Sequence, residues 1–147
     1  MNINGNNSVD HFHKKLGKIM WEFVGMARTE EGLLKAINEI KELRKEFYND
    51  LYIPGRAEEI NIELEKAYKV ADFLELGELM AYDAVNRKES CGGHFREEYQ
   101  TETGEALRDD VDFAYVAAWE WDESGKHKMH REDLKFENVE LKTRSYK

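Results

Sequence analysis

Three successive segments before residue 87 repeat apolar residues every three to four positions. This is the period of an α-helix that buries one face. The first segment follows Ser8, whose hydroxyl suits an N-cap, and we expect Gly25 to end the helix. Its spaced apolar residues are Phe12, Leu16, Ile19 and Phe23. Such a stripe has to be covered by another element, so the sequence predicts helices that pack on one another.

Two more helices are predicted after the first. Thr29 suits an N-cap, and the two glutamates that follow it complement the positive end of a helix dipole. The single proline, Pro54, removes a backbone donor and predicts a break before a longer helix from about Asn61 to Asn86. The apolar positions of the second helix are Leu33, Ile37, Ile40 and Phe47. Those of the third are Leu64, Ala67, Val70, Ala71, Phe73, Leu74, Met80 and Ala81.

Three amphipathic helices joined by short polar connections predict a mainly α fold. The simplest arrangement that hides all three stripes is an antiparallel three-helix bundle, similar to a spectrin repeat, over about residues 9–87. We expect residues 1–8, which are polar and rich in Asn, to be disordered or a linker. Residues 9–147 are then one helical domain with a small β extension.

The helical period stops after Arg87, where an irregular loop is expected. Residues 113–121 are rich in strand-forming types, and residues 135–141 alternate polar and apolar side chains. Asp122–Gly125, between them, supplies turn residues. The sequence therefore predicts a short antiparallel β-hairpin that caps the bundle.

Composition excludes several classes of protein. The net charge of −9 argues against binding to nucleic acid, because such binding needs clustered Lys and Arg. No apolar run approaches the roughly 20 residues that span a bilayer, and the residues after Met1 lack the pattern of a signal peptide. Cys91 is the single cysteine, so an intrachain disulfide is excluded. We expect a soluble, cytoplasmic protein.

Reactive side chains are concentrated in residues 86–110. His94 and Arg96 are two positions apart, so an extended chain would point them the same way, and the pair could hold a carboxylate. The alternative is structural, with His94, Arg96 and Arg108 paired to nearby carboxylates so that they pin a loop onto the bundle. The carboxylates within reach are Glu89, Glu97, Asp109 and Asp110.

Two other patterns are weaker. Cys91 and His94 have the spacing of half a zinc site, and His127 and His130 could add two nitrogens. Structural zinc is held by a closed set of four ligands, usually with more than one thiolate, so we predict no metal site. Ser90 lies beside these residues, but it lacks the Gly-x-Ser-x-Gly context and the orienting acid of a catalytic nucleophile.

The loop also carries a resemblance to a known family. Residues 87–96 and the Arg108-Asp109-Asp110 triplet are similar to the Glu-Ser-Arg-Gly-Ala-His and Arg-Asp-Asp pattern of the C-terminal domain of succinate dehydrogenase and fumarate reductase flavoproteins. Residues 16–29 resemble the first helix of that domain and its connection. Residues 141–147, with Arg-Ser-Tyr near their end, resemble its chain terminus. Cys91 and Gly93 replace the Arg and Ala common in the family, which indicates a subgroup.

The resemblance implies a parent enzyme that interconverts succinate and fumarate through FAD. Electrons would pass to or from quinone through an iron–sulfur subunit and a membrane anchor subunit, with the parent peripheral on the cytoplasmic face of the bacterial inner membrane. The Gly-x-Gly-x-x-Gly fingerprint of dinucleotide binding is missing from the sequence. Flavin-binding and capping domains are therefore expected in sequence outside this chain, as its partners.

This chain itself is then predicted to bind no cofactor, to contain no catalytic residue and to be inactive alone. His94, Arg96 and Arg108 are candidates for a loop near the interface with the flavin-binding and capping domains. A different interpretation is a stand-alone three-helix interaction module, whose crowded aromatic residues would recruit a partner. These aromatic residues are Phe113, Tyr115, Trp119 and Trp121.

Overall fold

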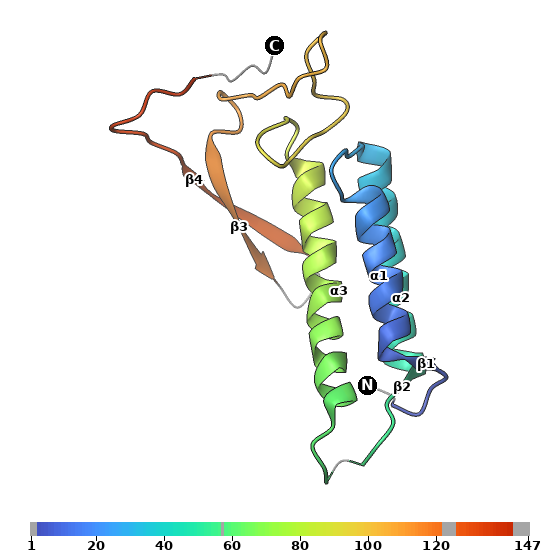
Figure 1. Ribbon diagram of the computed structural model, residues 1–147. Coiled ribbons are helices and arrows are strands. Elements are labelled where there is room, and N and C mark those ends of the chain that lie inside the picture. The colour runs from blue at the N-terminus through green and yellow to red at the C-terminus, as the bar shows by residue number, and fades with distance from the viewer. Residues whose placement is uncertain (1–2, 57, 122–125, 143–147) are drawn as a thin grey trace.

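The computed structural model describes residues 3–56, 58–121 and 126–142 of the chain. Its three long helices are α1 (Val9–Phe23), α2 (Glu30–Asp50) and α3 (Ile62–Asn86). Consecutive helices run antiparallel and lie side by side (Figure 1), so the predicted three-helix bundle is confirmed. Within the described ranges, no helix is long and apolar enough to cross a bilayer.

Side chains cap the N-terminus of each helix. The Ser8 hydroxyl accepts from the His11 backbone N–H at 3.3 Å, and the Thr29 hydroxyl accepts from that of Gly32 at 3.1 Å. Asn61 caps α3 in the same way through its side-chain oxygen. These contacts satisfy backbone donors that have no partner inside the helix, and they confirm the predicted helix starts.

The end of α1 differs in detail from the prediction. The helix ends at Phe23, and the backbone N–H of Val24 makes the closing hydrogen bond to the Met20 carbonyl at 3.0 Å. Gly25 does not have a positive φ, as a left-handed cap would require. A Cβ at Gly25 would lie 2.6 Å from the Trp21 carbonyl oxygen. A glycine is needed there because the backbone of the last turn passes so close.

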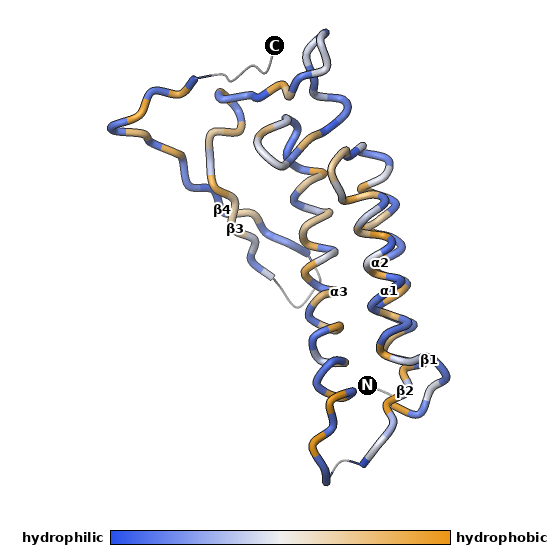
Figure 2. Tube along the Cα trace, in the orientation of Figure 1, coloured by the Kyte–Doolittle hydropathy of each residue, from blue (hydrophilic) through white to orange (hydrophobic). Residues whose placement is uncertain are grey.

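The core lies along the line where the three helices meet. Phe12 and Phe47 are fully buried and pack edge to face at 5.3 Å. Apolar residues also recur along the whole length of α3 (Figure 2), but α1 and α2 cover only part of them. Phe73 remains 44% exposed and Met80 46% exposed. The third helix therefore carries more apolar surface than the bundle buries.

Residues 3–8, which belong to the predicted linker, are hydrogen-bonded to the end of α2. Strand β1 (Asn7–Ser8) pairs in parallel with β2 (Leu51–Tyr52). The side chains of Asn6 and Asn7 both donate to the Asp50 carboxylate, at 2.8 and 2.6 Å. These hydrogen bonds lower the pKa of Asp50. The largest contribution comes from the backbone N–H of Asn6, and the side chains of Asn6 and Asn7 add to it. This part of the chain is therefore tied to the bundle.

A two-stranded antiparallel hairpin follows the loop. Its strands are β3 (Tyr115–Trp121) and β4 (His127–Asp133), with Trp121 opposite His127. The first predicted strand is confirmed, but the prediction of a strand over residues 135–141 is wrong. The residues that pair with β3 are those that directly follow the short connection, even though they are mostly polar, so chain connectivity outweighs the alternation at 135–141. The predicted turn, residues 122–125, lies outside the described residues.

The hairpin lies along the side of α3 and does not cap the bundle (Figure 1). The indole N–H of Trp119 donates to the Asp83 carboxylate at 2.7 Å, and the rings of Trp119 and Tyr82 meet at 5.1 Å. Tyr115 is buried, whereas Trp121 is 67% exposed. The end of the bundle is covered instead by the loop that follows α3.

Candidate functional site

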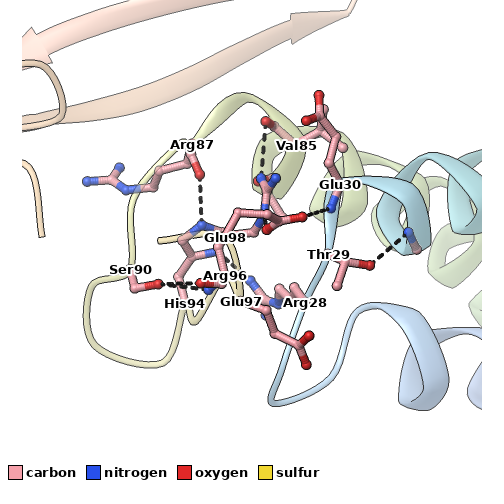
Figure 3. A network of polar contacts seen from close by, with 12 residues as sticks. Arg28, Thr29, Glu30, Val85, Arg87, Ser90, His94, Arg96, Glu97 and Glu98 are labelled. Atoms are coloured by element: carbon pink, nitrogen blue, oxygen red, sulfur yellow. Dashed lines mark hydrogen bonds and ion pairs between the residues drawn. The ribbon is translucent and has the colours of Figure 1, made fainter. Parts of the chain in front are cut away.

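The loop after α3 crosses the end of the bundle and reaches the connection between α1 and α2 (Figure 1). There the Arg28 backbone N–H donates to the Phe95 carbonyl at 3.0 Å, and the Glu97 N–H donates to the Arg28 carbonyl at 2.9 Å. We call the polar side chains that hold the loop in place the clamp. Its members are Arg28, Arg87, Ser90, His94, Arg96 and Glu98, which are labelled in Figure 3, and Glu89, which pairs with Arg87.

Arg96 lies at the centre of the clamp and is completely buried. Its Nη1 donates to the carbonyls of Ala84 and Val85, at 2.9 and 3.4 Å, in the last turn of α3. Carbonyls at a helix C-terminus have no partner in the helix and carry partial negative charge, so a guanidinium there satisfies them and complements the dipole. Arg96 Nε also donates to Glu98 Oε2 at 3.1 Å. Nε and Nη1 are thus bonded within the chain, whereas Nη2 is buried with no hydrogen-bond partner among the described residues.

Glu98 joins this arginine to the second helix. Its Oε1 accepts from the Glu30 backbone N–H at 2.6 Å, in the first turn of α2. Burial acts to raise the pKa of Glu98, but the backbone N–H of Glu30 and the Arg96 guanidinium outweigh it, so the pKa is lowered. An anion is thus placed at the positive end of the α2 dipole. The carboxylate and Arg96 together connect the end of α3 to the start of α2.

His94 is held as a neutral ring. Arg28 Nη1 lies 2.8 Å from His94 Nδ1, and because a guanidinium can only donate, Nδ1 is the acceptor. His94 Nε2 then carries the proton, which it donates to the Arg87 carbonyl at 2.9 Å. Burial lowers the pKa of His94, and the positive charges of Arg28 and Arg96 lower it further. His94 therefore holds the loop in place through its two hydrogen bonds and adds no positive charge to the clamp.

Ser90 and Glu89 complete the clamp. The Ser90 hydroxyl donates to the Arg96 carbonyl at 3.1 Å and accepts from the Arg96 N–H at 2.8 Å. Glu89, only 2% exposed, accepts from Arg87 Nε and from the Asp109 backbone N–H, both at 2.8 Å. The serine is engaged on both sides by backbone, which suits a structural role and not a nucleophile.

The structure brings His94 and Arg96 into the clamp, but it places Arg108 in a separate ion pair. Arg108 contacts both carboxylate oxygens of Asp110, at 2.6 and 2.7 Å, and its side chain is 26% exposed. The hydrogen bond that Arg108 donates to the Asp110 carboxylate raises the pKa of Arg108. Sequence reasoning missed Arg28 and Glu98, and it named Glu97 where Glu98 makes the contact. Adjacent glutamates cannot be told apart without knowing which one faces α2.

The geometry supports the structural interpretation of the loop. A free carboxylate would need an accessible cation, but Arg96 is buried and His94 is neutral. Cys91 and His94 close a tight turn through two backbone hydrogen bonds, with Gly92 at φ 58°. Among the residues described, no group of three or more His, Cys, Asp or Glu side chains could hold a metal ion.

The domain is thus a bundle of three helices with a polar clamp over its end and a hairpin along its side. The profile of the family "Fumarate reductase flavoprotein C-term" matches residues 13–146. The chain belongs to this family, as its loop residues predicted.

Relatives and solved structures agree with this assignment. The fumarate reductase flavoprotein subunit of Proteus vulgaris is 30% identical over 135 residues, which are 92% of this chain and 22% of that protein. The succinate dehydrogenase flavoprotein subunit of Rickettsia conorii is 31% identical over 123 residues, 84% of this chain and 20% of that protein. A structure of quinol–fumarate reductase with menaquinol molecules is 28% identical with a TM-score of 0.78, covering 95% of this chain and 23% of that chain. The chain thus spans about a fifth of the length of these relatives.

The described residues do not fit the flavin that the family implies. A dinucleotide site places a phosphate at a helix N-terminus that directly follows a strand of a parallel sheet. The one parallel pair in the described ranges has two residues in each strand. The N-terminus of α2 is already taken by Thr29 and by the carboxylate of Glu98. The described residues therefore lack the strand-to-helix arrangement that holds a dinucleotide phosphate.

Proposed function

We propose that this chain is the C-terminal helical domain of a longer flavoprotein subunit that interconverts succinate and fumarate. The observation that carries the proposal is the family match over residues 13–146, together with relatives that are fumarate reductase and succinate dehydrogenase flavoprotein subunits. The parent subunit would hold FAD in a domain outside this chain. Residues 9–147 act as one structural and docking unit and carry no catalytic residue.

The partners of the parent follow from the same proposal. Electrons pass between the flavin and quinone through an iron–sulfur subunit and a membrane anchor subunit. One relative is the 8-methylmenaquinol:fumarate reductase flavoprotein subunit of Wolinella succinogenes, and this supports the link to quinone. The absence of a membrane-spanning helix from the described residues is compatible with a peripheral place on the cytoplasmic face of the inner membrane.

Within this domain, the clamp would keep the loop in a fixed shape against the flavin-binding and capping domains. His94 and Arg96 act from inside the loop, since His94 Nε2, Arg96 Nε and Arg96 Nη1 bond to their own chain, whereas the buried Arg96 Nη2 has no hydrogen-bond partner among the described residues. Gly92 and Gly93 are exposed, and a Cβ added to either would meet nothing within 4 Å. These two glycines and Arg108, whose side chain is 26% exposed, are the loop residues that would face a neighbouring domain in this proposal.

The test is to extend the reading frame upstream of Met1 and to compare the two products. The 147-residue chain is expected to be colourless and to show no succinate oxidation with an artificial electron acceptor. The complete polypeptide is expected to bind FAD and to oxidise succinate. A yellow 147-residue chain, or a reading frame without a flavin-binding sequence, would contradict the proposal. The latter result would favour a stand-alone interaction module.

A further inference from the structure

An apolar groove runs between α1 and α3 on the surface of the bundle. It has a volume of about 220 Å³. The residues that line it are His13, Leu16, Gly17, Met20, Phe73, Leu76, Gly77 and Met80. His13 is the one titratable residue among them, although 36% of the chain is charged. We call this surface the apolar groove.

The groove exists because the bundle leaves part of α3 uncovered. Leu76 is 53% exposed, and Phe73 and Met80 are almost as exposed. Glycines on both walls keep it open. A Cβ added to Gly17 would meet nothing within 4 Å, whereas one added to Gly77 would lie 3.1 Å from Met20 Sδ. Each exposed apolar side chain is ordinary alone, but a hollow lined by several of them is typical of an interaction site.

The apolar surface continues from the groove toward the hairpin. A second hollow, of about 430 Å³, lies between α3 and β3, and Leu76 and Met80 line both. Val116, on β3, is 53% exposed there. The two hollows thus form one surface that extends from α1 across α3 to the hairpin.

A third hollow, on the other side of α1, shows what a solvated groove in this bundle looks like. It lies between α1 and α2 and has a volume of about 490 Å³. The residues that line it are Lys15, Ile19, Glu39, Glu42, Leu43, Lys45, Glu46 and Asn49. Lys15 and Glu46 form an ion pair across it at 2.7 Å. We call this surface the charged groove. The two sides of α1 therefore differ in chemistry. The charged groove carries Lys and Glu side chains that are stable in water, whereas the apolar groove is lined without any Lys, Arg, Asp or Glu.

We propose that the apolar groove is the surface on which the larger, N-terminal part of the same polypeptide docks. This inference rests on the proposed function, because it takes that part to be present. The family profile describes a C-terminal segment, and this chain spans about a fifth of its relatives' length, so in such a protein the remaining four fifths precede this domain. A segment joined covalently is present at a high effective concentration, which makes it a better occupant than a second copy.

The test uses cysteine labelling in the complete flavoprotein. Leu76→Cys reports on the apolar groove, and Glu42→Cys, on the charged groove, is the matched control. Both are made with Cys91→Ser, which removes the single cysteine of these 147 residues, and labelling is measured on the peptide that carries the new cysteine, so that thiols elsewhere in the complete polypeptide do not contribute. We expect Leu76→Cys to react with a maleimide at least 10-fold more slowly than Glu42→Cys in the native protein, and at the same rate in denaturant. Met80→Cys repeats the measurement if Leu76→Cys does not fold.

The outcomes separate this inference from the proposed function. Bound FAD and succinate oxidation, together with equal labelling of the two grooves, would overturn the docking inference and leave the proposed function in place. A complete polypeptide that binds no FAD would overturn the proposed function itself. Protection of Leu76→Cys that disappears on dilution would identify a second copy as the occupant and would also overturn the inference.

Discussion

Arg96 and Leu76 belong to two regions of the domain that are built in opposite ways. Arg96 is an arginine with no exposed surface, and its guanidinium contacts α3 and Glu98. Leu76 is a leucine with 53% of its surface exposed, on a groove that the described residues leave open. The clamp has the residue types of an active site, but its side chains bond mainly to one another and to the backbone of this domain. The apolar groove has no motif, yet it is the surface that lacks a partner.

The largest expected effect comes from Arg96→Met, which should lower the free energy of unfolding by about 3 kcal/mol. The substitution leaves the carbonyls of Ala84 and Val85 buried without their donor and removes the cation beside Glu98. Urea unfolding followed by circular dichroism measures the loss. Arg108→Met is the control, and it should cost less because Arg108 is partly exposed beside Asp110. Equal losses would show that the clamp has no special role.

Glu89→Gln should lower the free energy of unfolding by about 2 kcal/mol, because the buried partner of Arg87 loses its charge. The measurement is the shift of the urea midpoint at constant slope. Glu137→Gln, on an exposed residue after the hairpin, should change stability by less than about 0.5 kcal/mol. An unchanged urea midpoint for Glu89→Gln would show that the ion pair of Glu89 with Arg87 does not stabilise the domain.

Gly17→Ala should stabilise the 147-residue chain by about 1 kcal/mol, because alanine favours a helix over glycine and the new Cβ meets no atom within 4 Å. Gly77→Ala is the matched control on the facing wall. It should gain less, since its Cβ would lie 3.1 Å from Met20 Sδ. Thermal unfolding of both variants checks this. In the complete flavoprotein the gain at Gly17 should shrink if another segment fills the apolar groove, and an undiminished gain would argue against docking there.

The clamp should weaken in acid through His94, by less than in the substitutions above, because one partly buried ring is involved. Burial and neighbouring arginines hold the pKa of His94 below its ordinary value of 6.5. The folded state thus binds fewer protons than the unfolded state, so its stability rises with pH in this window. The contribution of neutral His94 is present above about pH 6.5 and is lost as the pH falls toward the lower folded pKa. Urea unfolding between pH 7 and 5 should show a smaller decrease in His94→Gln, and identical profiles would contradict the prediction.

The smallest effect is expected from Leu76→Gln in the 147-residue chain, where the free energy of unfolding should change by less than about 0.5 kcal/mol. The side chain is exposed, so its replacement exposes no core. Thermal unfolding measures the difference. The control is Leu74→Gln, two positions earlier on α3, where the side chain is fully buried and the loss of stability should be larger. A loss at Leu76 as large as that at Leu74 would show that the groove belongs to the core.

The parts of the fold that could be predicted from sequence depend on local chemistry. Ser8 and Thr29 cap helices through contacts three residues away, so their neighbours in sequence identify the role. The four apolar positions predicted for α2 are all buried, because helical spacing sets which side chains share a face, but the stripe also includes Ala36 and Leu43, which were not predicted. Two-residue strands such as β1 have no period to detect, and β4 is too polar to look like a strand.

The site could be located from sequence but not resolved. The density of reactive residues and the family resemblance both indicated the loop after α3. The destination of each side chain depended on contacts between distant segments, for example Arg28 with His94, which are 66 positions apart. Sequence alone could not show whether Arg96 reaches solvent or the end of α3. The pairing of Glu98 with Arg96 and Glu30 required the fold.

The same long separations have a consequence for the order of folding. Helices α1, α2 and α3 form from local contacts, whereas the clamp joins Glu30 to Glu98, 68 positions apart, and must wait for the whole bundle to close its loop. We expect the long-range contacts of the clamp, Arg28 with His94 and Glu30 with Glu98, to form after the transition state, so that their energy acts mainly on the rate of unfolding. Loss of these contacts should leave the folding rate almost unchanged, increase the unfolding rate and so shorten the lifetime of the folded domain.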